Sequence, residues 1–176
     1  MDNYLLLKNS SEVGQLSQKL GFTKACFLEE DLVLLTGKLT PETIKKINQA
    51  KSKKKTIVFI PETEEALRYI LEKTPVDIVL GVENIHPKES LHYSRGGLDQ
   101  ILLRIAAERG KTIAFSFSEI LQSKNRPRLL TRMRLNLQLC RKYKVKVIFS
   151  NFSRSLEELR SAKDLDAFKR ILEKNN

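Results

Sequence analysis

Short β-like runs alternate with helical patterns along most of the chain. Residues 56–60 (TIVFI) are rich in β-branched side chains and show no polar alternation, as expected for a strand buried on both faces. The segment that follows, residues 62–73, carries Leu67, Ile70 and Leu71 at helical spacing on one face. Because a helix placed between two strands lets them run in the same direction, the alternation predicts βα units and a mostly parallel sheet.

The pattern predicts about seven strands, most of them followed by a helix. The strands are expected at residues 4–8, 24–28, 32–35, 56–60, 77–82, 112–117 and 145–150. Helices are expected at residues 11–21, 40–51, 62–73, 97–110 and 155–174, with a long basic helix between residues 117 and 145. Periodicity does not decide between an open doubly wound sheet and a barrel. No linker or repeat interrupts the pattern, so residues 1–176 are predicted to form a single α/β domain.

Composition and cysteine use are typical of a globular protein inside the cell. Hydrophobic residues make up 41% of the chain and charged residues 30%. No apolar run is long enough to cross a bilayer and the first residues lack a signal-peptide pattern, so a cytoplasmic location is expected. Cys26 and Cys140 each lie in an apolar pattern and are predicted to be buried, reduced thiols; a disulfide or a metal site is the alternative.

Positive charge is concentrated in two blocks of a chain whose formal net charge is +11. One block is KSKKK at residues 51–55. The other, residues 124–154, contains ten Lys and Arg residues and no Asp or Glu. Such a stretch offers phosphates many donors without repelling them, so nucleic acid is the predicted partner. No helix pairs a basic face with bulky exposed aromatic residues, which argues against a membrane surface.

The basic helix has an apolar stripe on each of two sides. The stripe predicted to face the core consists of Leu129, Leu130, Met133, Leu137 and Cys140. On the other side, Leu135 and Leu139 lie among Arg128, Arg132 and Lys142. This second stripe is either a second buried face covered by arginine stems or a contact surface for a protein or RNA. The heads of Arg126, Arg128 and Arg132 are expected to be exposed.

The sequence shows no convincing set of catalytic or metal-binding residues. His86 and His92 lie near Glu83 and Asp77, but the first strand has no side chain that binds metal. Ser94 has no evident base beside it, and neither GxxxxGK[ST] nor GxGxxG occurs. The two histidines are therefore predicted to be loop residues, with no catalytic or metal site and no cofactor on this chain. A metal-dependent phosphoesterase or nuclease stays open as the alternative.

Several ordered motifs in the second half resemble one known family. They are HYSRGGLDQILLRIAAERGKTIAFSFSEIL (residues 92–121), RLLTRMRLNLQLCRKYKVKVIFSN (residues 128–151) and ELRSAKDLDAF (residues 158–168). The first contains a His-Tyr-x-x-x-Gly-Leu entry into a helix, formed by His92, Tyr93, Gly97 and Leu98 and followed by Asp99 where an Asn is commoner. These motifs, strongest over residues 91–172, resemble the archaeal ribonuclease P protein component 3 family, which has a homologous subunit in eukaryotic ribonuclease P and ribonuclease MRP.

The resemblance implies both a fold and a role. The fold is a distorted TIM-barrel-like (β/α) barrel, related to the metal-dependent phosphoesterase (PHP-like) barrels but without their metal ligands. The role is that of an RNA-binding protein subunit of ribonuclease P, the endonuclease that removes the 5′ leader from precursor tRNA. The RNA of that particle carries the catalytic site and its Mg²⁺ ions. The implied partners are ribonuclease P RNA, precursor tRNA, a small RRM-like protein subunit and further protein subunits.

Charge pattern and resemblance together give a set of site residues. Because no aromatic stacking platform is evident, recognition of the RNA backbone and shape is expected, rather than reading of bases. The predicted protein-partner contacts are Leu135 and Leu139. The predicted RNA-binding residues are Arg95, Arg104, Lys124, Arg126, Arg128, Arg132, Arg134, Arg141, Lys142, Arg154 and Arg160.

Overall fold

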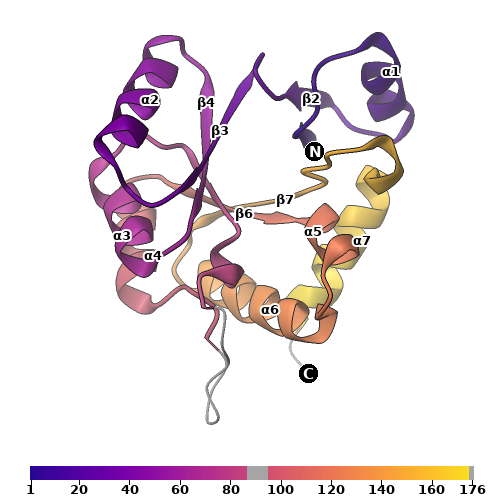
Figure 1. Ribbon diagram of the computed structural model, residues 1–176. Coiled ribbons are helices and arrows are strands. Elements are labelled where there is room, and N and C mark those ends of the chain that lie inside the picture. The colour runs from indigo at the N-terminus through magenta and orange to yellow at the C-terminus, as the bar shows by residue number, and fades with distance from the viewer. Residues whose placement is uncertain (87–94, 175–176) are drawn as a thin grey trace.

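Five parallel strands form the main sheet of the computed structural model, which describes residues 1–86 and 95–174 (Figure 1). In spatial order they are β3 (Leu32–Gly37), β4 (Thr56–Pro61), β5 (Ile78–Leu80), β6 (Thr112–Ser116) and β7 (Lys146–Ser150). The register sets Thr56 opposite Leu32, and Thr112 opposite both Ile78 and Lys146. The predicted α/β class with a mostly parallel sheet is therefore confirmed.

Two further strands, β1 (Asp2–Leu5) and β2 (Lys24–Phe27), form a second parallel sheet. Isolated bridges join it to the main sheet at both sides, one between Leu5 and Ser153 and one between Leu28 and Leu32. The described residues thus contain the seven predicted strands. The structure shifts the first strand to begin at Asp2 and shortens the fifth, because residues 82–84 form the 3₁₀ helix η1 (Val82–Asn84).

The helices begin at polar caps. Thr40, before Pro41, accepts a hydrogen bond from the Thr43 amide, and Asp99 accepts bonds from the Ile101 and Leu102 amides. Two predicted helices are divided: α5 (Phe117–Gln122) is separate from the basic helix, and the 3₁₀ helix η2 (Leu156–Glu158) precedes α7 (Ala162–Glu173). The α-helices are α1 (Ser11–Lys19), α2 (Pro41–Ser52), α3 (Glu64–Lys73), α4 (Gln100–Glu108), α5 (Phe117–Gln122), α6 (Arg126–Lys142) and α7 (Ala162–Glu173).

Buried apolar residues line both faces of the main sheet. The outward face packs against the helices through a large cluster that includes Ile57, Phe59 and Phe115. The inward face contributes Val58, Ile78 and Ala114 to a second cluster, which β2 joins with Cys26. Because both sheets line this second cluster and β6 and β7 cross β3 and β4 steeply (Figure 1), the sheets curl around a common interior.

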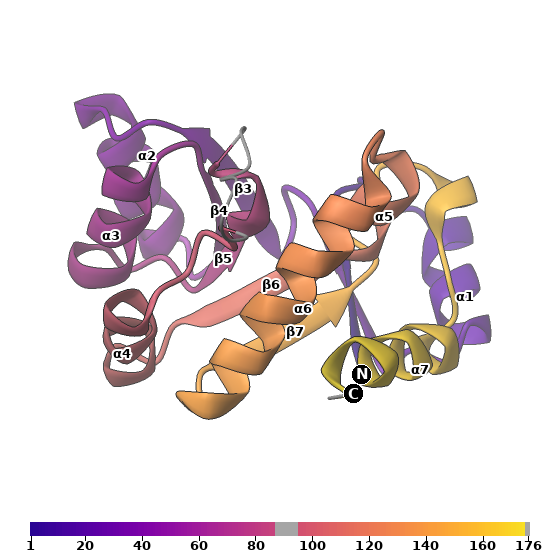
Figure 2. The same ribbon diagram turned by 90° about the horizontal axis from the view of Figure 1, so that it is seen from below.

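Helix α6 lies diagonally across the face of the molecule turned toward the viewer in Figure 2, with α4 on one side of it and α7 on the other. It contacts α4 and η1 as well as α7 and β7. Leu129, Met133, Leu137 and Cys140 of its predicted core stripe are buried, while Leu130 is half-buried. Cys26 and Cys140 are both buried and unpaired, as expected. In the part of the chain that is described, no helix is both long and apolar enough to span a membrane.

Candidate RNA interface

The arginines at the start of α6 bind the protein's own backbone. Arg126 donates from Nε to the carbonyl oxygen of Ile120 at 3.0 Å and from Nη2 to that of Leu121 at 2.8 Å, near the end of α5. Arg128 donates from Nη2 to the carbonyl oxygen of His86 at 2.8 Å. These guanidinium groups satisfy backbone acceptors between elements, which limits the donors they can offer to a phosphate.

Arg132 is buried, contrary to the prediction that its head is exposed. Its exposed fraction is 1%, and Nη1 donates to the carbonyl oxygens of Glu83 at 2.8 Å and His86 at 2.6 Å. The reason is the position of η1, which follows β5 directly and brings these two carbonyl groups against α6. A side chain enclosed in this way cannot reach an RNA phosphate, so Arg132 is withdrawn from the predicted RNA-binding residues.

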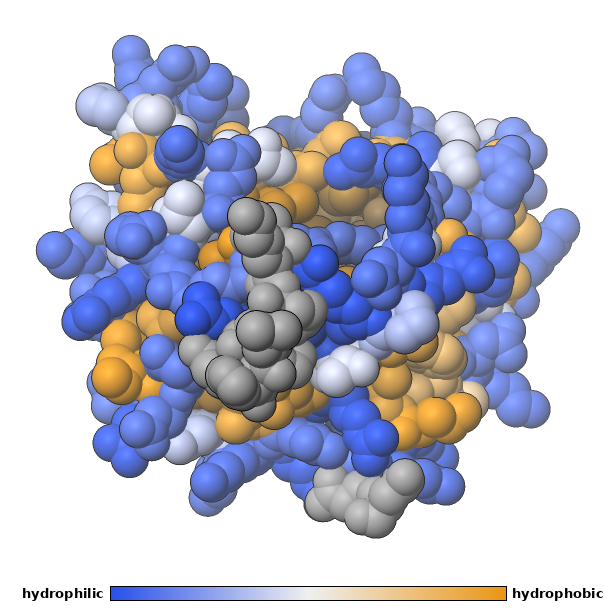
Figure 3. Space-filling view, turned by 60° about the horizontal axis from the view of Figure 1, so that its bottom comes forward, coloured by the Kyte–Doolittle hydropathy of each residue, from blue (hydrophilic) through white to orange (hydrophobic). Residues whose placement is uncertain are grey.

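The remaining predicted cations do not gather in one patch. Arg134 donates to the carbonyl oxygen of Lys174, and Arg160 donates to those of Glu157 and Leu159. Lys124 precedes α6 and Lys142 ends it, so the 17-residue helix, roughly 25 Å long, separates them. Figure 3 shows hydrophilic residues interrupted by apolar patches on the face that comes forward in that view. The exposed candidates are Arg95, Arg104, Lys124, Arg126, Arg141, Lys142 and Arg154.

A cavity of about 190 Å³ with a mixed polar and apolar lining lies at the carboxyl ends of the strands, where barrel enzymes keep their active sites. Its lining includes Asn84, Ser118, Glu119 and Arg154. Burial raises the pKa of Glu119, opposed by the hydrogen bond from Asn84 and the charge of Arg154. Among residues 1–86 and 95–174, no three His, Cys, Asp or Glu side chains are placed to hold a metal ion together.

The first of the two predicted loop histidines is held by its neighbours. His86 Nε2 lies 2.7 Å from Oε1 of Glu64, and its carbonyl oxygen accepts the bonds from Arg128 and Arg132 described above. His92, with Tyr93 and Ser94, lies outside the described residues. The structure therefore gives His86 a place in the packing between α3 and α6.

The second apolar stripe of α6 is divided between two environments. Leu139 is half-buried and packs against the large core cluster. Leu135 lines a groove of about 640 Å³ between the starts of α3 and α4, together with Glu64, Arg68 and Ile101. One leucine thus belongs to the core, and the other borders an open surface.

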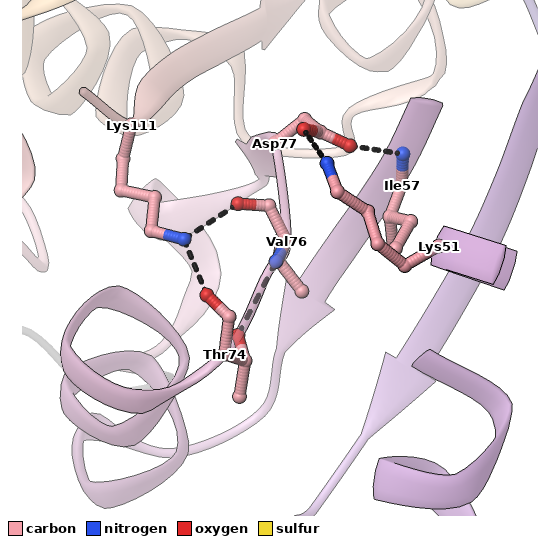
Figure 4. Close-up of polar contacts among 6 residues, drawn as sticks. All are labelled: Lys51, Ile57, Thr74, Val76, Asp77 and Lys111. Atoms are coloured by element: carbon pink, nitrogen blue, oxygen red, sulfur yellow. Dashed lines mark hydrogen bonds and ion pairs between the residues drawn. The ribbon is translucent and has the colours of Figure 1, made fainter. Parts of the chain in front are cut away.

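Sequence reasoning noted the KSKKK block but missed that Lys51 gathers with Arg109 and Lys111 at the opposite, amino-terminal edge of the main sheet. Lys51, Arg109 and Lys111 line a cavity of about 450 Å³ there, with Asp77 as the acidic residue of the lining (Figure 4 shows Lys51, Asp77 and Lys111). These cations come from two turns separated by more than fifty residues. The sequence did contain a signal for this grouping. Both turns precede strands predicted to be parallel, and the starts of parallel strands lie along one edge of a sheet.

Sequence comparison relates this chain to archaeal proteins. No protein-family model matches it. Ribonuclease P protein component 3 of Methanosarcina mazei is 32% identical over 111 residues, 62% of this chain and 43% of the relative. Component 3 of Methanosarcina barkeri is 36% identical over 101 residues, 56% of this chain and 39% of the relative. The resemblance to ribonuclease P protein component 3 is confirmed.

The chain spans about two fifths of the length of these component 3 relatives. The similarity in fold to a solved structure covers more of this chain than the similarity in sequence does. A chain in the cryo-EM structure of archaeal ribonuclease P with mature tRNA superposes with a TM-score of 0.73 at 22% identity, covering 98% of this chain and 73% of that chain. The shared fold therefore extends over almost the whole of this chain, well beyond the part similar in sequence to the M. mazei component 3 protein.

Proposed function

We propose that this chain is an RNA-binding protein subunit of ribonuclease P. In this role it supports the catalytic RNA in endonucleolytic removal of the 5′ leader from precursor tRNA. The observation that carries the proposal is the similarity to component 3 proteins, supported by the shared fold with a chain of the archaeal ribonuclease P structure. The net charge of +11 fits a partner that is rich in phosphate.

The proposal assigns the chemistry to the RNA. Ribonuclease P RNA would carry the Mg²⁺ ions and the reacting phosphate, while this chain would hold the RNA in its working shape. The other partners would be a small RRM-like protein subunit, further protein subunits and precursor tRNA, in the cytoplasm. The fold would be an incomplete barrel, since the seven strands curl around the shared interior cluster but form two separate ladders.

Reconstitution tests this function. Ribonuclease P RNA and the remaining protein subunits are assembled with and without this chain, and release of the 5′ leader from precursor tRNA is measured. We expect the chain to increase the cleavage rate or to lower the Mg²⁺ concentration required. We expect no cleavage by the chain alone. An assembly that cleaves equally well without the chain, over the full Mg²⁺ range, would refute the proposal.

The alternative, a metal-dependent phosphoesterase or nuclease, makes an opposite prediction. Such an enzyme would hold stoichiometric zinc or manganese after purification and would cleave a phosphodiester without RNA. Metal analysis of the same preparation therefore separates the two functions.

A further inference from the structure

Three chain segments that precede strands of the main sheet carry much of the positive charge. They are residues 51–55 before β4, residues 108–112 at the start of β6 and residues 141–146 at the start of β7. Together they contain ten Lys and Arg residues against a single acidic residue, Glu108. Because β4, β6 and β7 are parallel members of one sheet, these segments lie along the same edge. We call this edge the basal edge.

Helix ends explain only part of this charge. The carbonyl groups at a helix C-terminus attract cations, which accounts for Lys51, Arg141 and Lys142 in the last turns of α2 and α6. Lys53 and Lys144 lie beyond those helices, and Lys146 is the first residue of β7. All three are exposed, and no hydrogen bond or ion pair of their side chains is among the contacts found in the described structure. The ammonium groups of these three lysines therefore face solvent.

The cavity at the basal edge lies near the middle of this charge. Lys111, only 8% exposed, donates from Nζ to the carbonyl oxygens of Thr74 and Val76, the latter at 2.8 Å. Lys51 Nζ lies 3.0 Å from Oδ1 of Asp77, whose Oδ2 accepts the Ile57 amide at 2.9 Å (Figure 4). The only carboxylate in the lining is thus already engaged by Lys51 and by backbone.

The cations of this cavity repel one another. Burial lowers the pKa of Lys111, Asp77 opposes that shift, and the charges of Lys51 and Arg109 lower the pKa further. An anion bound at the edge would relieve the repulsion. From β4 to β7 the edge crosses three strand spacings, roughly 14 Å in all, which suits a row of phosphates better than one small anion.

We propose that the basal edge is the surface of this chain that binds the phosphate backbone of RNA, with Lys53, Arg109 and Lys146 among its contacts. This inference rests on the proposed function for the identity of the RNA. The aromatic residues at this edge, Tyr4 and Tyr143, are half-buried, and no aromatic residue is among the exposed large hydrophobic side chains of the described residues, so contacts to the RNA backbone are expected there instead of base stacking. The surface follows the backbone and shape of a folded RNA.

Two matched triple variants test the surface. The first is Lys53→Gln, Arg109→Gln, Lys146→Gln. The second removes the same charge elsewhere, by Lys38→Gln, Lys45→Gln, Lys163→Gln, all exposed and outside the three basal segments. Affinity for ribonuclease P RNA and for an unrelated folded RNA of similar length is measured from low to high salt, and thermal melting confirms that both variants are folded.

The basal variant should bind RNA about tenfold or more weakly at physiological salt, with the slope of log K against log salt smaller by two or three. The control variant should stay within about threefold of the parent chain. Equal losses in both variants would show that only net charge matters, and no loss in the basal variant would show that RNA lies elsewhere; either result overturns the proposal. So would efficient competition by millimolar inorganic phosphate, which would indicate a site for a small anion.

These affinities and the reconstitution assay together separate this inference from the proposed function. If the basal variant loses affinity for RNA but the parent chain leaves cleavage by reconstituted ribonuclease P unchanged, the surface stands and the ribonuclease P role fails. If the parent chain prefers ribonuclease P RNA and the basal variant keeps that preference at full affinity, the role stands and the surface fails.

Discussion

The guanidinium group of Arg132 joins helix α6 to the carbonyl oxygens of Glu83 and His86, at 2.8 and 2.6 Å. Glu83 is the middle residue of η1 and His86 follows it by three residues, so one side chain fixes the segment that leaves β5. A basic residue that looked available for RNA is therefore part of the packing.

Replacing Arg132 should destabilise the fold. Arg132→Met keeps much of the volume but leaves two carbonyl groups without this donor, so we expect the free energy of unfolding to fall by about 2–4 kcal/mol. Chemical denaturation measures this. Arg141→Met, in the exposed last turn of the same helix, is the control and should change it by less than about 0.5 kcal/mol. Equal effects in both variants would contradict the structural role.

Glu83 should make stability depend on pH. Its side chain is 1% exposed, and neither carboxyl oxygen accepts a hydrogen bond from a described residue. Burial raises its pKa to about 8 and the charge of Glu119 raises it further, while the nearby backbone amide of Glu83 itself and the charge of Arg132 oppose the shift. The folded state therefore keeps a proton that the unfolded chain has lost above its ordinary pKa of 4.5.

Because the folded-state pKa is raised, this contribution to stability is complete below pH 4.5 and is lost as the pH rises toward 8. Between pH 5 and 8.5 the free energy of unfolding of the parent chain should fall by a few kcal/mol relative to that of Glu83→Gln, since each unit of pKa difference is worth about 1.4 kcal/mol. Denaturation of both proteins across this range measures the difference. Parallel stability curves for the two proteins would mean that Glu83 does not titrate as described.

Gly97 should not tolerate a side chain. Its φ is +92°, and a Cβ built on it would lie 2.0 Å from the carbonyl oxygen of Val82. Gly97→Ala should therefore cost about 3–5 kcal/mol of folding free energy, or displace the segment before α4. Gly110 is the control: its φ is +63°, but no atom lies within 4 Å of a built Cβ. A side chain there strains the backbone without a steric clash. Gly110→Ala should cost about 1–2 kcal/mol, and a similar cost at both glycines would count against the close approach to Val82.

The two leucines of the second α6 stripe should behave differently. Leu139→Ser removes a side chain packed on the core and should lower the free energy of unfolding by about 1–3 kcal/mol. Leu135→Ser borders the open groove and should cost less than about 1 kcal/mol. Thermal melts, run beside a binding assay with the other protein subunits, check both. A contact with a protein partner at Leu135 stays a prediction, and it fails if Leu135→Ser binds every subunit at parent affinity.

His86 should matter for packing rather than for chemistry. In a reconstituted particle, His86→Ala should keep the rate of precursor tRNA cleavage within a small factor, since its ring pairs with Glu64 and its backbone carries the contacts to Arg128 and Arg132. A modest drop in melting temperature is expected. Cleavage by the purified chain alone that disappears in His86→Ala would instead support the phosphoesterase alternative.

The sequence by itself determined which segments are strands and helices, because apolar periodicity and end signals act over a few residues. Residues 56–60 lie in a buried strand, and Thr40 with Pro41 starts α2, as their types require. It also determined the core stripe of α6, since the spacing of Leu129, Met133 and Leu137 follows the helical period.

Only the tertiary structure decided which charges are available to a partner. Arg132 and Lys142 lie on the same side of α6 in the helical pattern, yet the packing of η1 against α6 buries the first and leaves the second exposed. Likewise, Lys53 and Lys146 are more than ninety residues apart in the chain, and they share an edge because β4 and β7 are parallel strands of one sheet. Local periodicity carries no information about neighbours across a sheet, so burial of a cation and the gathering of a charged surface depend on topology.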